Sequence, residues 1–215
     1  MFLCRKNNLV FAQFSILAEC PEIFHGIFTR SPGPAAQGTS LDIGENSDRE
    51  RTEVKSARKS VSECVGASEL VFLNQVHGTG ICVIDKQNPG KAGEQKPPPA
   101  DALISQNAGT GLVIQTADCQ SVMLYDPAKN AVANIHSGWR GSIANIIGKC
   151  VKAMHENFGT DPSDLKAGIG PSLGPCCSEF VNYEGEIPES FWKYKDEKNR
   201  FNFWLASIDQ LREAG

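Results

Sequence analysis

Residues 111–148 read GLVIQTADCQSVMLYDPAKNAVANIHSGWRGSIANIIG, and this stretch decides the fold that we expect. Its apolar β-prone runs predict three strands, and its turn residues predict a tight connection before the last strand. Beyond HSGWRGS, apolar residues recur at helical spacing up to Gly159, a typical helix stop. The strand runs are 112–114, 122–124 and 131–135, the turn is 126–130, and the helical positions are Ile143, Ile146, Ile147, Cys150, Val151, Met154 and Phe158.

The flanking sequence adds further strands and two further helices. One helix is expected after the capping-box pattern Ser47–Glu50, ends before Gly66, and follows a Pro/Gly/Ser loop at 31–40. Several strands follow one another without an intervening helix, which predicts a mixed sheet rather than regular βαβ alternation. The expected strands are 9–17, 24–30, 70–73, 81–84, 101–104, 167–169 and 201–205, with a polar loop at 86–99 and a last helix from about Ala206.

Composition limits the class of protein. The 215 residues carry a net charge of −4, so no basic footprint for nucleic acid is expected, and no apolar run is long enough to span a membrane. We expect one domain over residues 1–215. The eight cysteines show no disulfide-scaffold spacing, which indicates a reducing, cytoplasmic compartment, and adjacent Cys176 and Cys177 are expected to pack rather than to bind metal.

Three potential metal ligands each follow a β-rich run. They are His77, Cys119 and His136, and each precedes a small or turn-prone segment. Imidazole nitrogen and thiolate sulfur are preferred zinc ligands, and three protein ligands leave a fourth position for water or substrate. Spacing alone does not distinguish such a site from two loop histidines and a buried thiol.

Six motifs, in order along the chain, carry a resemblance. They are HGIFTR at 25–30, NQVHG at 74–78, ADALIS at 100–105, TADCQSVMLYDP at 116–127, HSGWRGS at 136–142 and GPSLGPCC at 170–177. Together they resemble the bacterial laccase-domain family, also called peptidoglycan editing factor or multicopper polyphenol oxidase. That family includes purine nucleoside phosphorylases with adenosine deaminase activity.

The resemblance implies a fold and a function. It implies an α+β fold, a four-layer αββα sandwich with mixed sheets that is similar to the catalytic domain of cytotoxic necrotizing factors. It also implies that His77, Cys119 and His136 bind zinc in a phosphorylase and deaminase acting on adenosine, inosine or methylthioadenosine. The alternatives are an amidase that removes L-serine from a UDP-muramic acid precursor, a polyphenol oxidase, and a catalytically weak metal-binding module. In a further variant, Cys119 is a nucleophile that needs no metal.

Other residues have expected roles that follow from their chemistry. Asp118, beside Cys119, is expected to move a proton or to orient a ligand, with a turn cap as the alternative. Arg140 and Ser142, at an expected helix start, and Arg30, at a strand end, suit an anion such as phosphate, with salt bridges as the alternative for Arg140. Gln75 is expected either to orient substrate or to hold its loop.

The expected partners are small molecules, a purine nucleoside and phosphate, and the sequence specifies no oligomeric state. Four histidines are too few for a trinuclear copper cluster, although copper can occupy the same His/Cys/His site as zinc. The sequence departs from the family pattern in one larger respect. It reaches Gly215 without the Cys-Thr and aromatic-Arg-Arg segment with which the family usually continues. We expect either a truncated form or a shortened protein with a more open site.

Overall fold

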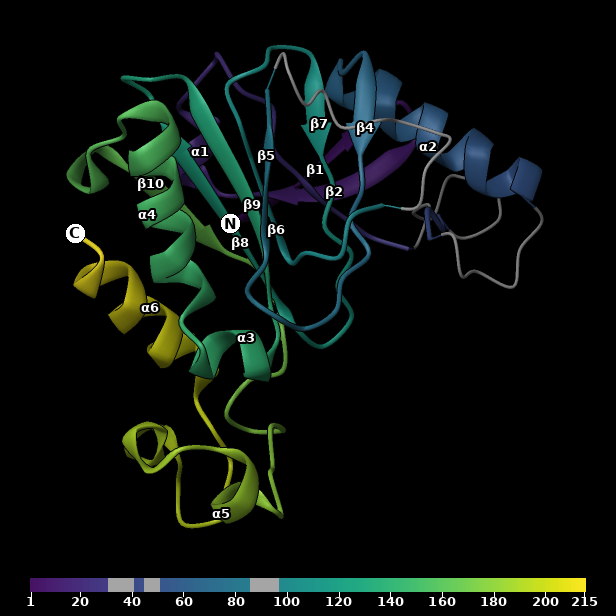
Figure 1. The fold of residues 1–215 in the computed structure, drawn as a ribbon. Helices are drawn as coiled ribbons and strands as arrows, with labels where there is room; N and C mark the ends of the chain where they lie inside the picture. The colour runs from purple at the N-terminus through teal and green to yellow at the C-terminus, as the bar shows by residue number, and fades with distance from the viewer. Residues whose placement is uncertain (31–40, 45–50, 86–96) are drawn as a thin grey trace. The chain divides into compact units, whose positions relative to one another are not determined.

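A computed structural model describes residues 1–30, 41–44, 51–85 and 97–215 (Figure 1). These divide into two compact units: unit 1 is Met1–Val71 with Asn107–Gly111, and unit 2 is Phe72–Gln106 with Leu112–Gly215. The loop at 31–40, the capping box at 47–50 and most of the loop at 86–99 lie outside the described residues. The single domain expected from the sequence stays a prediction.

Unit 1 contains a three-stranded antiparallel sheet and two helices. The sheet has the order β1-β2-β3, and β4 pairs with β7 in a separate two-stranded sheet. The expected strand at 9–17 is too long, because the amides of Leu17 and Ala18 turn back to the carbonyl of Phe14 and form a helical turn. The elements are β1 (Phe2–Lys6), β2 (Leu9–Gln13), α1 (Ser15–Ala18), β3 (Ile27–Phe28), α2 (Arg51–Val65), β4 (Glu69–Val71) and β7 (Thr110–Leu112).

The end of α2 follows from one glycine. The helix ends at Val65, and Gly66 then takes a φ of +74°, the left-handed conformation that a side chain disfavours. The predicted end of this helix is therefore confirmed.

Unit 2 is built on a five-stranded sheet with the order β10-β8-β9-β6-β5. β5 pairs with β6 in parallel and the other pairs are antiparallel, so the predicted mixed sheet is confirmed. Gln120 at the start of β8 lies opposite Ser137 at the end of β9. The residues just before β8 and those at the end of β9 therefore lie next to each other, at the same end of the strands. The strands are β5 (Ile81–Ile84), β6 (Ala102–Ser105), β8 (Gln120–Asp126), β9 (Ala131–Ser137) and β10 (Lys166–Ile169).

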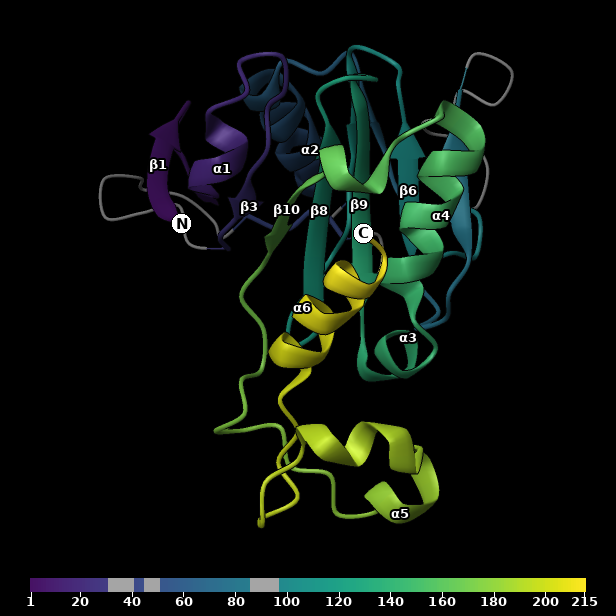
Figure 2. The same cartoon turned by 90° about the vertical axis from the view of Figure 1, so that its left-hand side faces the viewer.

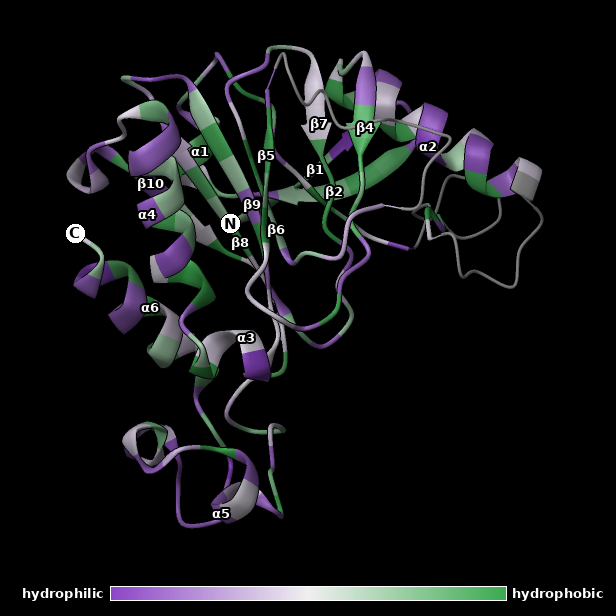
Figure 3. Cartoon of the chain, in the orientation of Figure 1, coloured by the Kyte–Doolittle hydropathy of each residue, from purple (hydrophilic) through white to green (hydrophobic). Residues whose placement is uncertain are grey.

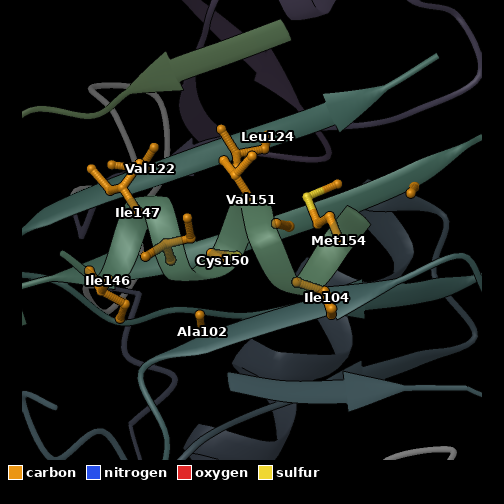
Figure 4. Close-up of a cluster of buried hydrophobic side chains, with 12 residues drawn as sticks. Ala102, Ile104, Val122, Leu124, Ile146, Ile147, Cys150, Val151 and Met154 are labelled. Carbon is orange, nitrogen blue, oxygen red and sulfur yellow. The ribbon is translucent and has the colours of Figure 1, made fainter. Parts of the chain in front are cut away.

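One face of this sheet packs against α4 (Ile146–Phe158), as Figure 4 shows. Alternate strand residues face the helix because successive side chains of a strand point to opposite faces. Figure 3 shows hydrophobic residues along these strands, and Figure 2 shows α4 and α6 lying across them. The buried cluster comprises Ala102, Ile104, Val122, Leu124, Ala131, Ala133, Ile135, Ile146, Ile147, Cys150, Val151 and Met154.

The helix expected after residue 142 is in fact two helices. α3 (Trp139–Ile143) is a short helix, and Asn145 then takes a left-handed conformation before α4 begins. The Asn145 side chain accepts a hydrogen bond from the Gly148 amide, so this residue caps the new helix. Gly159, with a φ of +68°, ends α4 as predicted.

The C-terminal part contains four short or medium helices. The expected strand at 201–205 is wrong: α6 begins at Phe203, because the Asn202 side chain accepts a hydrogen bond from the Leu205 amide and caps the helix. Figure 1 shows α5 and its flanking loops beyond α3 at one end of unit 2. The elements are η1 (Pro162–Asp164), α5 (Tyr183–Glu186), η2 (Glu189–Tyr194) and α6 (Phe203–Glu213).

The predicted α+β class is confirmed, with several sheets and helices. The four-layer αββα arrangement and the likeness to cytotoxic necrotizing factors stay predictions. Among the described residues, no helix combines the length and the apolar character that crossing a bilayer requires.

Candidate metal centre

The structure brings the three predicted metal ligands together. The candidate ligand atoms of His77, Cys119 and His136 all lie within 4.8 Å of one another. Cys119 directly precedes β8, and His136 lies near the end of β9, so the antiparallel pairing of these strands places them at the same edge. His77 comes from the loop between β4 and β5, and its ring meets that of His136 edge to face at a centroid distance of 4.8 Å.

Asp101 is the carboxylate that organises this cluster. It is fully buried, directly before β6, and its Oδ1 lies 2.8 Å from Nδ1 of His136. The buried carboxylate accepts a hydrogen bond from the imidazole, so Nδ1 carries the hydrogen and Nε2 is left free to bind a metal. The His136 amide also donates to the Asp101 carbonyl at 2.7 Å, so backbone and side chain together fix the ring.

The same carboxylate holds the loop that carries His77. The amides of Val76, His77 and Gly78 donate to Asp101 at 3.3, 2.9 and 2.7 Å. His77 has a φ of +59°, an uncommon conformation for a residue with a side chain, which costs roughly 1–3 kcal/mol. Hydrogen bonds to an ionised carboxylate are stronger than neutral ones and offset this cost. Asp101 therefore positions two of the three ligands.

The backbone of Gly138 lies against the three candidate ligands, and this residue has no side chain to crowd them. A Cβ at this position would lie 3.0 Å from the His77 ring, 3.2 Å from the Cys119 sulfur and 3.7 Å from the His136 ring. Zinc bonds of about 2.0–2.3 Å place tetrahedral ligands roughly 3.5 Å apart, so small side-chain rotations bring these three donors around one ion. The donor set and its oriented imidazole fit a zinc or copper ion.

The surroundings of His136, which is buried, and of Cys119, which is half-buried, favour the neutral forms of both side chains. Burial lowers the pKa of His136, although Asp101 acts in the opposite direction. Burial also raises the pKa of the Cys119 thiol, and the charges of Asp118 and Asp101 add to this effect. A metal ion must therefore displace the Cys119 proton when it binds.

Gln75 and Asp118 lie beside the ligands. The Gln75 amide group donates to the Gln115 carbonyl at 2.7 Å and accepts from the Gln115 amide at 2.8 Å. Both ends of the Gln75 side chain are thus used to join the two ligand-bearing loops, which favours the loop-holding alternative. Asp118 is exposed, and its backbone carbonyl accepts from the Leu173 amide at 3.0 Å. Its role in proton transfer stays a prediction.

The residues expected to bind an anion occupy three different settings. Arg140 is exposed, with its guanidinium 4.2 Å from the centre of the Trp139 ring. Ser142 is fully buried: its hydroxyl lies 3.0 Å from that of Ser137, and its amide donates to the Gly138 carbonyl. Arg30 belongs to unit 1, where its guanidinium lies 4.0 Å from Asp42. Anion binding stays a prediction for all three, and burial of the Ser142 side chain does not favour it.

Asp101 and Gly138 are site residues that the sequence patterns did not predict. Asp101 had a usable signal, since it is an acidic residue that opens the apolar strand of the ADALIS motif. Gly138 lies in the HSGWRGS motif, but only the folded structure shows that its Cα faces the three ligands.

Comparison with known proteins agrees with these motifs. Residues 24–215 match the family described as "Multi-copper polyphenol oxidoreductase laccase". The chain is 31% identical over 207 residues to the "Purine nucleoside phosphorylase" of Bacteroides thetaiotaomicron, covering 91% of this chain and 72% of that protein. It is 32% identical over 152 residues to the "Purine nucleoside phosphorylase YlmD" of Geobacillus stearothermophilus, covering 68% of this chain and 54% of that one.

Solved structures show the same fold. YlmD from Geobacillus stearothermophilus aligns with a TM-score of 0.79 and 25% identity, over 96% of this chain and 81% of that one. The Bacillus licheniformis hypothetical protein YfiH aligns with a TM-score of 0.80 and 21% identity, over 99% and 84% of the two chains. On the match over residues 24–215, the chain belongs to the multi-copper polyphenol oxidoreductase laccase family, which is the laccase-domain family that its motifs resemble.

Proposed function

We propose that this protein is a cytoplasmic purine nucleoside phosphorylase that also removes the 6-amino group of adenosine, with a zinc ion held by His77, Cys119 and His136. The observation that carries the proposal is the convergence of these three donors within 4.8 Å of one another, beside a glycine whose missing Cβ would contact all three side chains. Relatives named purine nucleoside phosphorylase support the substrate class.

The reaction is phosphorolysis of a glycosidic bond. A phosphate oxygen forms a bond to C1′ of the ribose while the bond from C1′ to the purine nitrogen breaks, giving ribose 1-phosphate and the free base. Zinc bound by His77, Cys119 and His136 would supply a Lewis acid and would promote the ionisation of water, which suits the deamination step.

The protein's own residues orient the reactants and handle protons. Asp101 keeps the Nδ1 proton of His136 in place and so presents Nε2 to the site. The exposed guanidinium of Arg140, four residues after His136, provides a permanent positive charge for phosphate. Asp118 is an exposed carboxylate next to Cys119 and is suited to accept or return a proton near the reacting base.

The test is an assay of metal-analysed protein with adenosine, inosine and methylthioadenosine, with and without phosphate. We expect phosphate-dependent release of the base, and ammonia from adenosine. Arg140→Ala should raise the KM for phosphate about ten- to hundredfold, as expected for losing a charged hydrogen-bonding partner, and leave zinc content unchanged. Arg212→Ala is the matched control, because this arginine is also exposed and its ion pair with Asp209 lies on α6.

The same assay separates the alternatives. Metal-loaded protein that ignores nucleosides but releases L-serine from UDP-muramyl-serine is an amidase, and oxygen-dependent turnover of phenols by the copper-loaded form indicates an oxidase. If the protein binds metal but shows none of these activities, the remaining alternative is a catalytically weak metal-binding module. If His77→Ala and Cys119→Ser both retain the full metal content, the proposed site is wrong.

A further inference from the structure

Cys176 and Cys177 differ from every other cysteine of the chain. All eight cysteines lie in described residues, and these two alone are exposed, whereas Cys20, Cys64 and Cys150 are buried. Burial raises the pKa of Cys150 to about 12, which makes that thiol unreactive. The expectation that Cys176 and Cys177 pack in the interior is therefore wrong, and their exposed sulfurs are available for chemistry.

The two sulfurs are held against each other. Sγ of Cys176 lies 3.0 Å from Sγ of Cys177, although neighbouring side chains commonly point apart. The turn that carries them is fixed on both sides: the amides of Cys177 and Ser178 donate to the Gly174 carbonyl at 2.9 and 3.1 Å. The Arg200 guanidinium donates to the Cys176 carbonyl at 3.4 Å. The pair is thus a preorganised dithiol and not two independent surface thiols.

The charges around the pair act in opposite directions. The neighbouring Cys176 thiol raises the pKa of Cys177, while the positive charge of Arg200 lowers it. Arg200 is itself paired with Asp196 through a 2.8 Å hydrogen bond, which weakens its influence. The contact with Cys176 outweighs Arg200, so the pKa of Cys177 is raised overall, and the reactivity of the pair depends on the closeness of the two exposed sulfurs.

We propose that Cys176 and Cys177 form a modification site that closes reversibly to a disulfide when it reacts with a hydroperoxide. One thiolate sulfur attacks a peroxide oxygen, the O–O bond breaks, and a sulfenic acid forms as hydroxide leaves and is protonated. The second sulfur then attacks the sulfenic sulfur, the S–S bond forms, and a second water leaves. Two thiols lose two electrons and two protons, and hydrogen peroxide is reduced to two waters.

The closed form should be easy to reduce. Adjacent Cα atoms lie about 3.8 Å apart, below the roughly 4.4–6.8 Å typical of disulfides, so the ring is strained. Strained and exposed disulfides have more oxidising potentials and are the labile ones, so glutathione should reopen this one. The site therefore suits a reducing compartment, where a permanent disulfide would not persist.

The site lies on the loop that runs beside a metal ligand. After β10, the Gly170 amide donates to the Ser121 carbonyl at 2.7 Å, and the Leu173 amide donates to the Asp118 carbonyl at 3.0 Å. The two cysteines therefore follow a segment that is hydrogen-bonded to Asp118 and Ser121, the residues on either side of Cys119 and Gln120. The proposal is independent of the reaction catalysed at the metal centre, because it rests on the dithiol alone.

The experiment treats the metal-loaded full chain with hydrogen peroxide, blocks the remaining thiols with iodoacetamide and digests the chain with trypsin. Residues 167–193 contain no lysine or arginine before Lys193, and their only cysteines are Cys176 and Cys177. We expect this peptide to lose two hydrogens and to resist alkylation, and glutathione to restore both alkylated thiols. An adjacent thiol has an effective concentration of order millimolar, so closure should be at least about tenfold faster than disulfide formation between chains at micromolar protein.

Matched variants make the result decisive. Cys176→Ser and Cys177→Ser should each give a peptide that never loses two hydrogens and whose single remaining thiol is alkylated or oxidised alone. Cys82→Ser should behave as the unmodified chain does. The proposal is overturned if both thiols remain alkylatable at peroxide doses that oxidise other cysteines, or if they oxidise only into bridges between chains.

Discussion

Asp101 is the residue on which the geometry of the metal centre depends most, because it accepts hydrogen bonds from the His136 ring and from three successive amides. In Asp101→Asn, one oxygen acceptor becomes an NH₂ donor that faces hydrogen-bond donors. We expect zinc affinity to fall about 10–100-fold, measured by competition with a chromophoric chelator. Asp118→Asn is the comparison, since that carboxylate is exposed. If Asp118→Asn lowered zinc affinity equally, the orienting role would not belong to Asp101 alone.

His25 offers a prediction about pH in unit 1. Its buried ring accepts a 2.8 Å hydrogen bond from the Phe14 amide at Nε2, and burial lowers its pKa. The folded chain therefore keeps His25 neutral while the unfolded chain binds a proton below its ordinary pKa of 6.5. His25 therefore makes its full contribution to the free energy of unfolding above that pH. This contribution falls as the pH falls, by at most about 1.4 kcal/mol per pH unit.

The measurement is the free energy of unfolding of unit 1, from hydrogen exchange of its amides at several pH values between neutral and mildly acidic. His25→Gln removes the titration and should flatten this dependence over the range in which histidine titrates. A slope that is unchanged in His25→Gln would assign the effect to other groups.

At the scale of elements, α3 starts close to the candidate ligands, so adding one methyl group at its N-cap residue, Gly138, should disturb metal binding. Gly138→Ala places a Cβ 3.0 Å from the His77 ring and 3.2 Å from the Cys119 sulfur, so ligands or helix must move. We expect metal content, measured by elemental analysis, to fall by about tenfold or more with the fold retained, as for other changes that displace ligands. Gly185→Ala on α5 is the control, because its Cβ would meet nothing within 4 Å. Full metal occupancy in Gly138→Ala would show that the ion lies elsewhere.

Elements that follow from local sequence patterns could be predicted. Helix starts that depend on the side-chain cap of one asparagine could not. Apolar β-prone runs predicted β5 over 81–84 and the two strands β8 and β9, and Gly66 and Gly159 predicted two helix ends. The break at Asn145 depends on a left-handed residue within an apolar pattern that continues through it. At the other end of the chain, the Asn202 cap converts a β-prone aromatic run into α6.

The candidate site shows the same division. The grouping of His77, Cys119 and His136 could be predicted, because each follows a strand run and belongs to a motif of the family that the chain resembles. An acidic residue at the start of an apolar strand marks Asp101 in the sequence, but its partners could not be predicted, because they lie 23 to 35 positions away along the chain. The exposure of Cys176 and Cys177 also depends on how the loop after β10 folds back along residues 118–121.

At the scale of the whole molecule, all three ligands and Asp101 belong to unit 2. An ion that binds only the folded site stabilises it by about 2.7 kcal/mol when its free concentration is a hundred times its dissociation constant. We expect zinc to slow hydrogen exchange in 72–106 and 112–215, and chelation to reverse this, while amides of unit 1 change little. Equal protection of both units would show that they unfold together and are not separate cooperative regions.

We expect the turn between β8 and β9 to determine the order in which the candidate ligands come together during folding. Only residues 127–130 connect the two strands, and the Asp126 carboxylate accepts from the Ala128 and Lys129 amides within that turn. A hairpin with so short a loop forms in roughly 1–10 μs, whereas the parallel pairing of β5 with β6 must first close a longer loop. Cys119 and His136 are therefore neighbours early, and His77 joins them only when Asp101 arrives with β6. A nascent chain thus first offers an ion a weak two-donor site, and the third donor is added with the carboxylate that orients the second.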